Sequence, residues 1–151
     1  MPHQLEFRSA LRASRAEAWD WITSVKGIST ELRPILRMSV PRGVSGLPAS
    51  GIEPGKPLFR SRIYLLGLLP VDYSDLTLIE LKDGIGFVEQ SPMGSMRLWR
   101  HERRIEAAEP GCAVTDVLTF QPRFASNLLK WFIQRLFTHR HAVLRRHLGN
   151  A

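Results

Sequence analysis

The chain of 151 residues is 44% hydrophobic, which is enough for one domain with a substantial core. Its longest apolar run, residues 64–71, is far shorter than the roughly 20 residues of a membrane-spanning helix, and its first residues lack the apolar stretch of a signal peptide, so we expect a cytoplasmic protein. The formal net charge of +7 permits attraction to nucleic acid, anionic lipid or an acidic ligand without choosing among them. No RNA-binding motif, zinc finger or basic heptad region is present, which argues against specific nucleic-acid binding. The lone Cys112 cannot form an internal disulfide and is expected to be an ordinary strand residue.

The N-terminal part predicts a strand followed by two short helices. Residues 4–12 are typical of a strand. Ser14 and Glu17 then have the spacing of a capping box, in which each side chain accepts from the other residue's backbone N–H at a helix start, and a helix through about Val25 should follow. We expect a second, shorter helical piece around residues 30–32.

The rest of the chain predicts an antiparallel sheet closed by one long helix. Residues 35–40 indicate a short strand, and the four prolines and four glycines within residues 41–57 indicate a loop. The hydrophobic pattern then takes the period of two that is typical of strands, interrupted by short turns. The strands expected there cover residues 58–66, 71–82, 85–91, 96–107 and 112–121. A helix over residues 124–148 completes an α+β domain, because a curved sheet must cover its apolar face.

The segment WRHERRI, residues 99–105, places charge on the inward face of this sheet. Strand alternation puts Trp99, His101 and Arg103 on one side and leaves a solvated set on the other. The next hairpin brings that side onto the same face as Asp116. Arg103 and Asp116 should therefore lie directly opposite or diagonal to each other, close enough to pair.

Two further segments place charge inward. Glu89 alternates with Phe87 and is expected beside it on the inward face. In the last helix, a periodicity of about 100° per residue gathers one broad apolar face. That face comprises Ala125, Leu129, Phe132, Ile133, Leu136, Val143 and Leu144. Arg140 falls near its middle, whereas His141 is expected to lie elsewhere on the helix.

Two opposed apolar surfaces that both carry charge indicate a cavity with a polar patch. The alternative is structural, since buried arginine and aspartate usually form ion pairs and an inward histidine is often a hydrogen-bonded core residue. No serine-histidine-aspartate elbow or glycine-rich phosphate loop is present, and His139, His141 and His147 do not share a helical face tightly enough for a metal site. We therefore expect no metal, no cofactor and no assigned catalytic residue.

The chain resembles the START-like superfamily, also called SRPBCC or helix-grip, which includes lipid-transfer domains, pollen-allergen-like carriers and polyketide cyclases or dehydrases. The resemblance covers nearly the whole chain and rests on an ordered set of short motifs. These are AWDWI at 18–22, ELRP at 31–34, WRH at 99–101, TDVL at 115–118 before Pro122, and FTHR at 137–140. It implies a single domain over residues 1–151 with the α+β helix-grip fold: a curved antiparallel sheet of about seven strands around the long C-terminal helix, and two short helices after the first strand. It also implies a hydrophobic cavity between sheet and helix.

The main hypothesis is a binding protein for a small hydrophobic or amphipathic molecule, lipid-like or polyketide-like, with its acidic or polar head near His101, Arg103 and Arg140. The candidate ligand-binding residues are Phe87, Glu89, Trp99, His101, Arg103, Asp116, Leu118, Phe120, Phe132, Leu136 and Arg140. A second hypothesis is a cyclase or related acid/base enzyme that uses His101 and Asp116. A third is a peripheral membrane or interaction module that uses the basic end of the last helix, with transient membrane contact. Oligomeric state and ligand identity stay open.

Overall fold

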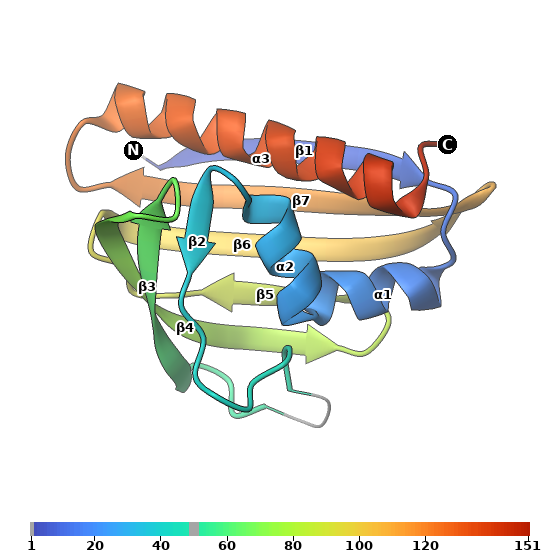
Figure 1. Ribbon diagram of the computed structural model, residues 1–151, viewed down its shortest axis with the longest axis horizontal. Coiled ribbons are helices and arrows are strands. Elements are labelled where there is room, and N and C mark those ends of the chain that lie inside the picture. The colour runs from blue at the N-terminus through green and yellow to red at the C-terminus, as the bar shows by residue number, and fades with distance from the viewer. Residues whose placement is uncertain (1, 49–51) are drawn as a thin grey trace.

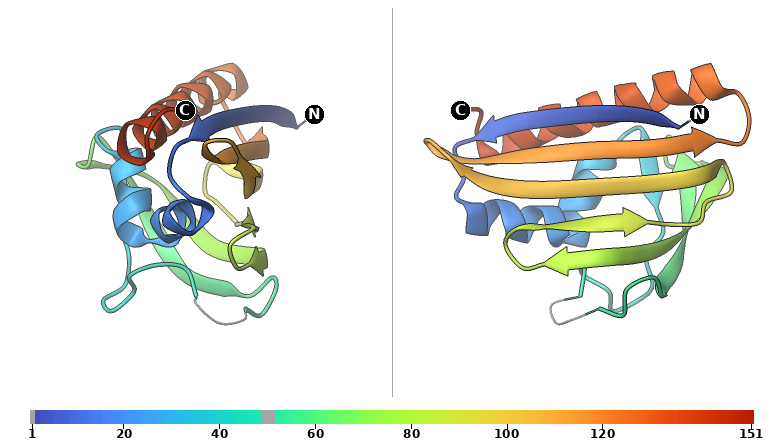
Figure 2. Two further views of the ribbon diagram at one scale, coloured as in Figure 1. Left: turned by 90° about the vertical axis from the view of Figure 1, so that its right-hand side faces the viewer. Right: turned by 180° about the vertical axis from the view of Figure 1, so that it is seen from behind.

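Seven antiparallel strands form one curved sheet in the order β1-β7-β6-β5-β4-β3-β2, which confirms the predicted fold class. The computed structural model describes residues 2–48 and 52–151. Its strands are β1 (His3–Leu11), β2 (Leu36–Met38), β3 (Pro57–Leu65), β4 (Leu69–Lys82), β5 (Gly86–Gln90), β6 (Met96–Ala108) and β7 (Gly111–Pro122). Its helices are α1 (Arg15–Thr23), α2 (Val25–Leu32) and α3 (Ser126–Leu148). Figures 1 and 2 show the sheet curling around the helices, with α3 running along β1 and β7 and α2 beside it.

The first helical segment breaks into two helices at Ser24. The predicted capping box is present at the start of α1, where Glu17 N donates to Ser14 Oγ over 3.2 Å. The second helix is longer than the predicted piece around residues 30–32, because the Ser24 hydroxyl accepts from Gly27 N over 2.9 Å and caps a helix that begins at Val25. A Cβ on Gly27 would lie 2.0 Å from the Trp21 carbonyl oxygen, so glycine is what allows α1 and α2 to approach so closely.

The remaining boundaries differ from the predictions by a few residues. The helix α3 begins at Ser126, not at residue 124, because Ala125 adopts a left-handed backbone conformation with φ 46°. The predicted loop over residues 41–57 is irregular where the structure describes it, although Pro57 already belongs to β3, and its residues 49–51 lie outside the described residues. Cys112 is a buried residue of β7, as expected.

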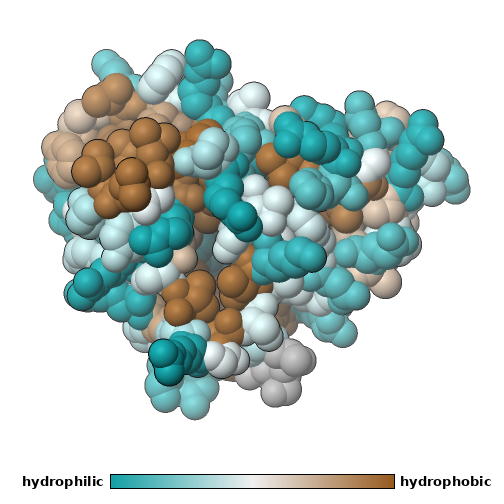
Figure 3. Space-filling model, in the orientation of Figure 1, coloured by the Kyte–Doolittle hydropathy of each residue, from teal (hydrophilic) through white to brown (hydrophobic). Residues whose placement is uncertain are grey.

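The register of β6 and β7 places the charged residues between two apolar clusters. Arg103 pairs directly with Asp116, which confirms one of the two predicted registers. Along β6, Trp99 belongs to one core cluster and Ile105 to the other, so His101 and Arg103 lie between them. Within the part of the chain that the structure describes, no helix is long and apolar enough to cross a membrane. In Figure 3 the face seen in Figure 1 is largely hydrophilic, with apolar areas at the upper left and below the centre.

Candidate functional site

A buried ion-pair network joins four elements at the centre of the protein. Arg103 of β6 donates to both oxygens of Asp116 at 2.7 and 2.9 Å and to both oxygens of Glu31 at 2.9 and 3.1 Å. Glu31 of α2 also accepts from Arg140 Nε at 3.0 Å and from Trp21 Nε1 at 3.0 Å. Two guanidinium groups and two carboxylates therefore cancel in charge, and their hydrogen bonds offset the cost of removing them from water.

The pKa values of these groups follow from burial and from their partners. Burial favours the neutral acid, but Arg103 and His101 outweigh it and hold the pKa of Asp116 well below its usual range. Burial acts in the same direction on Glu31, and Arg103 and Arg140 lower its pKa in spite of it. For Arg140 burial prevails, and its pKa is lowered although Glu31 opposes the shift. Both carboxyls are therefore ionised at neutral pH.

Two histidines donate to Asp116 through Nε2. His101 Nε2 lies 2.6 Å from one carboxylate oxygen, and His141 Nε2 lies 2.7 Å from the other. Because an ionised carboxylate only accepts, each ring carries a proton on Nε2. His141 Nδ1 then accepts from Ser9 Oγ at 2.7 Å. The Nδ1 of His101 has no donor among the described residues, and its nearest charged neighbour is Glu89 Oε1 at 3.8 Å.

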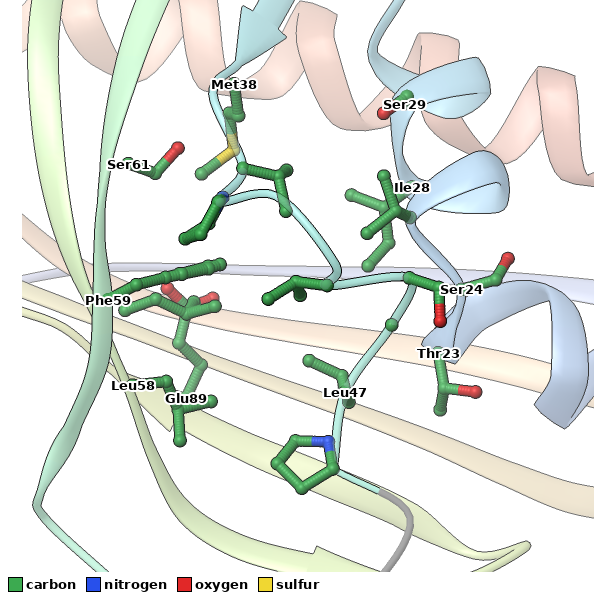
Figure 4. Close-up of a pocket in the computed structure, with 18 of the residues that line it drawn as sticks. Thr23, Ser24, Ile28, Ser29, Met38, Leu47, Leu58, Phe59, Ser61 and Glu89 are labelled. Carbon is green, nitrogen blue, oxygen red and sulfur yellow. The ribbon is translucent and has the colours of Figure 1, made fainter.

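A cavity of about 820 Å³ opens beside this network, between the sheet, α2 and the segment at residues 38–48. Its walls are mostly apolar, and its inner end carries the side chains of Glu89, His101 and Arg140. Figure 4 shows Phe59 extending from β3 into the space, with Leu58 and Glu89 on the same side and Thr23 and Ser24 on the other. The site therefore has an apolar body and a polar end, which suits an amphipathic molecule.

The structure divides the candidate binding residues into three groups. Phe87, Glu89, His101 and Arg140 line the cavity. Arg103 and Asp116 are fully buried behind it and reach it only through their hydrogen bonds. The third group lies in or against the core cluster beneath α3 and does not line the cavity; it comprises Trp99, Leu118, Phe120, Phe132 and Leu136. Trp99, Leu118 and Phe120 share the predicted face of the sheet, and α3, which carries Phe132 and Leu136, packs on that part of the face.

Two network residues were missed by the sequence analysis. Glu31 has no exposed surface, although glutamate is rarely buried. In a helix that begins at Val25, helical periodicity puts Glu31 on the same side as Ile28 and Leu32, so a longer predicted helix would have placed it inward. The expectation that His141 lies away from the apolar face is wrong, since it is buried and follows the buried Phe137 by one helical turn. The predicted apolar face did not include Phe137, which lies on the same side of the helix as His141.

The three arginines at the basic end of the last helix differ in exposure. Arg140 is buried in the network, and Arg145 donates to Ser9 Oγ over 2.9 Å. Only Arg146 of these three arginines is exposed. Three or more metal-ligating side chains are nowhere grouped in residues 2–48 and 52–151.

Comparisons with known proteins give one matching family and several solved structures of similar fold. A family described as "Domain of unknown function (DUF8410)" matches residues 9–148. The aromatase/cyclase ZhuI from Streptomyces sp. R1128 superposes with a TM-score of 0.71 at 10% identity, covering 98% of this chain and 94% of the other. A START superfamily protein from Mycobacterium smegmatis gives 0.63 at 7% identity, covering 97% and 96%. The protein Ara h 8.0201 gives 0.59 at 15% identity, covering 95% and 99%. None of the curated proteins compared with the chain matches it.

Proposed function

The chain belongs to the DUF8410 family and has the START-like, helix-grip fold, and we propose that it binds a small amphipathic molecule with an acidic head group in the cavity beside α2. The head group contacts Arg140 and His101 at the inner end. The apolar body lies against Ile28, Met38, Leu47, Phe59, Leu76 and Leu78. A volume of about 820 Å³ falls within the roughly 300 to 1,000 Å³ typical of sites for molecules of this size.

The observation that carries the proposal is that only one nitrogen of the Arg140 guanidinium has a hydrogen-bond acceptor among the described residues. Its Nε donates to Glu31, but no partner for its two terminal nitrogens is found among the described residues, although the side chain is 91% buried and lines the cavity. Among the described residues neither terminal nitrogen is a buried polar atom without a partner, so both keep accessible surface that a molecule in the cavity can reach. A carboxylate in the cavity would supply two acceptors in the bidentate geometry that arginine favours.

The fold neighbours support this class of ligand at the level of the superfamily. One is named as an aromatase/cyclase and another as a START superfamily protein. Folds host many chemistries, so the chemical class proposed here rests on the cavity residues of this chain.

The test compares an acid with its ester on one variant. Displacement of an environment-sensitive apolar dye by dodecanoic acid should be saturable at about one site, and Arg140→Met should weaken the acid by roughly 1.5 to 3 kcal/mol while sparing its methyl ester. The control is Arg146→Met, an exposed arginine of the same helix, which should change neither affinity. Equal losses for acid and ester, or no saturable binding, would refute the head-group role of Arg140.

A second candidate is acid/base catalysis on such a ligand. The observation that favours it is the pair formed by Asp116 and His101, in which the carboxylate orients the ring and leaves Nδ1 free of protein donors at the cavity. Product analysis by mass spectrometry distinguishes the two functions. For an enzyme, His101→Ala should abolish turnover with affinity kept within a few-fold, whereas a carrier returns the ligand unchanged in both proteins.

A further inference from the structure

An exposed apolar surface lies at one end of the molecule, away from the cavity lining. We call it the tip surface; it comprises Leu66, Leu68, Leu69 and Val71 at the β3–β4 turn and Phe124, Leu128 and Trp131 at the start of α3. These side chains are between 54% and 82% exposed. Figures 1 and 2 place the β3–β4 turn and the first turns of α3 at the same end of the protein, and the apolar area at the upper left of Figure 3 lies there.

Backbone strain marks both halves of the tip surface. Leu66 has φ 53° and Ala125, next to Phe124, has φ 46°; the described residues contain no other non-glycine residue with positive φ. Leu66 and Gly67 are the central positions of a tight turn closed by Leu68 N donating to the Leu65 carbonyl, where asparagine and glycine are favoured. A leucine there costs stability and buries little in the folded chain, which favours a role for its side chain in contact with a partner.

The charged side chains near the tip surface in the sequence are mostly basic. The flanking basic side chains are Arg37, Arg123, Lys130 and Arg135. Arg37 lies 4.1 Å above the Tyr64 ring and donates to the Gly67 carbonyl at the turn. No acidic residue follows Asp116 in the sequence. The nearest acidic residue after the turn, Asp72, is bonded to Ser95.

We propose that the tip surface docks on a lipid bilayer that contains anionic lipid. Its leucines form a projecting turn and not a groove, and they are accompanied by Trp131 with Arg135 5.5 Å above its ring. Leucine and tryptophan with basic residues at the rim are the composition of interfacial membrane anchors, and anionic head groups complement the four cations. The proposal is independent of the ligand in the cavity, because the seven residues of the tip surface do not line it.

The experiment is co-sedimentation of the full chain with phosphatidylcholine vesicles that contain equimolar phosphatidylglycerol. Leu66→Asn with Leu68→Asn should lower partitioning by about tenfold or more, since each leucine loses its transfer into lipid. Asparagine suits the left-handed turn, so the melting temperature should not fall. The control is Ile85→Asn, an exposed apolar residue at the β4–β5 turn at the opposite end, which should keep partitioning within twofold. Leu128→Gln is a second variant; its position on α3 is exposed, so the substitution should not lower the stability of the fold.

Changes in side-chain charge, lipid composition and salt concentration distinguish a bilayer from other partners. Lys130→Glu with Arg135→Glu, pure phosphatidylcholine vesicles and high salt should each reduce binding by tenfold or more. The proposal is overturned if the wild-type chain does not sediment with anionic vesicles, or if Ile85→Asn loses as much binding as the turn variant. It is also overturned if the turn variant keeps vesicle binding and instead converts a dimer into a monomer by light scattering, since the surface would then join two copies of the chain.

Discussion

The substitution Glu31→Gln tests whether the buried network holds the fold together. The two oxygens divide its four donors equally: Oε1 accepts from Arg103 Nη2 and Arg140 Nε, and Oε2 accepts from Trp21 Nε1 and Arg103 Nη1. A glutamine in either orientation turns one of these oxygens into an NH₂ group that faces two donors. The variant thus loses two hydrogen bonds and leaves the buried network with one uncompensated positive charge. We expect a loss of roughly 3 to 5 kcal/mol in the free energy of unfolding.

The assay is urea unfolding followed by circular dichroism, with the melting temperature as a second readout. A loss of this size lowers the melting temperature of a chain of this length by roughly 10 to 15 °C. The control is Glu102→Gln on the outer face of β6, whose partners Arg100 and Arg104 are partly exposed, with a cost of about 0.5 kcal/mol or less. Equal effects of the two substitutions would refute the reasoning. A double-mutant cycle with Arg140→Met should give a coupling of roughly 0.5 to 3 kcal/mol.

Three further outcomes follow from particular residues. The pKa values of Glu31 and Asp116 are lowered in the folded state, so their contribution to the free energy of unfolding is complete above their unfolded pKa values near about 4. That contribution is lost as the pH falls below those values, so the free energy of unfolding should decline when it is measured down to about pH 2. A flat profile would contradict the ion pairs. Gly27→Ala should cost roughly 1 to 3 kcal/mol in urea unfolding, because its Cβ would meet the Trp21 carbonyl oxygen at 2.0 Å; a neutral result would show that α1 and α2 separate easily. Ser14→Ala removes the α1 cap and should cost about 1 kcal/mol by the same measurement, against no change for Asp20→Ala on the exposed side of that helix.

The sheet could be predicted because its signals are local. Alternation along β6 and the short turn before β7 fixed which side chains share a face, and the structure places Arg103 opposite Asp116 as one of the two expected registers. The α1 cap likewise depends on two residues three positions apart. Such patterns involve only neighbours in the chain, so the sequence displays them.

The position of the cavity could not be predicted, because it depends on how separate elements pack. Trp99 and Phe120 share the inward face with His101, yet α3 covers them and the cavity lies farther along, beneath α2 and residues 38–48. Glu31 belongs to the network only because α2 folds over β6 and α3 at once. Neither relation leaves a periodic signal in the sequence.

The buried network has a consequence for folding kinetics. The hydrogen bonds that Glu31 accepts come from Arg103, 72 residues away in the sequence, and from Arg140, 109 residues away. We expect such long-range bonds to form only after most of the chain has become compact. Interactions that form after the rate-limiting step leave the folding rate almost unchanged and slow unfolding instead. We therefore expect the Glu31→Gln variant to unfold faster on dilution into denaturant and to refold at the normal rate. We also expect the backbone amides of α2 and α3 to exchange with solvent only when the entire domain opens.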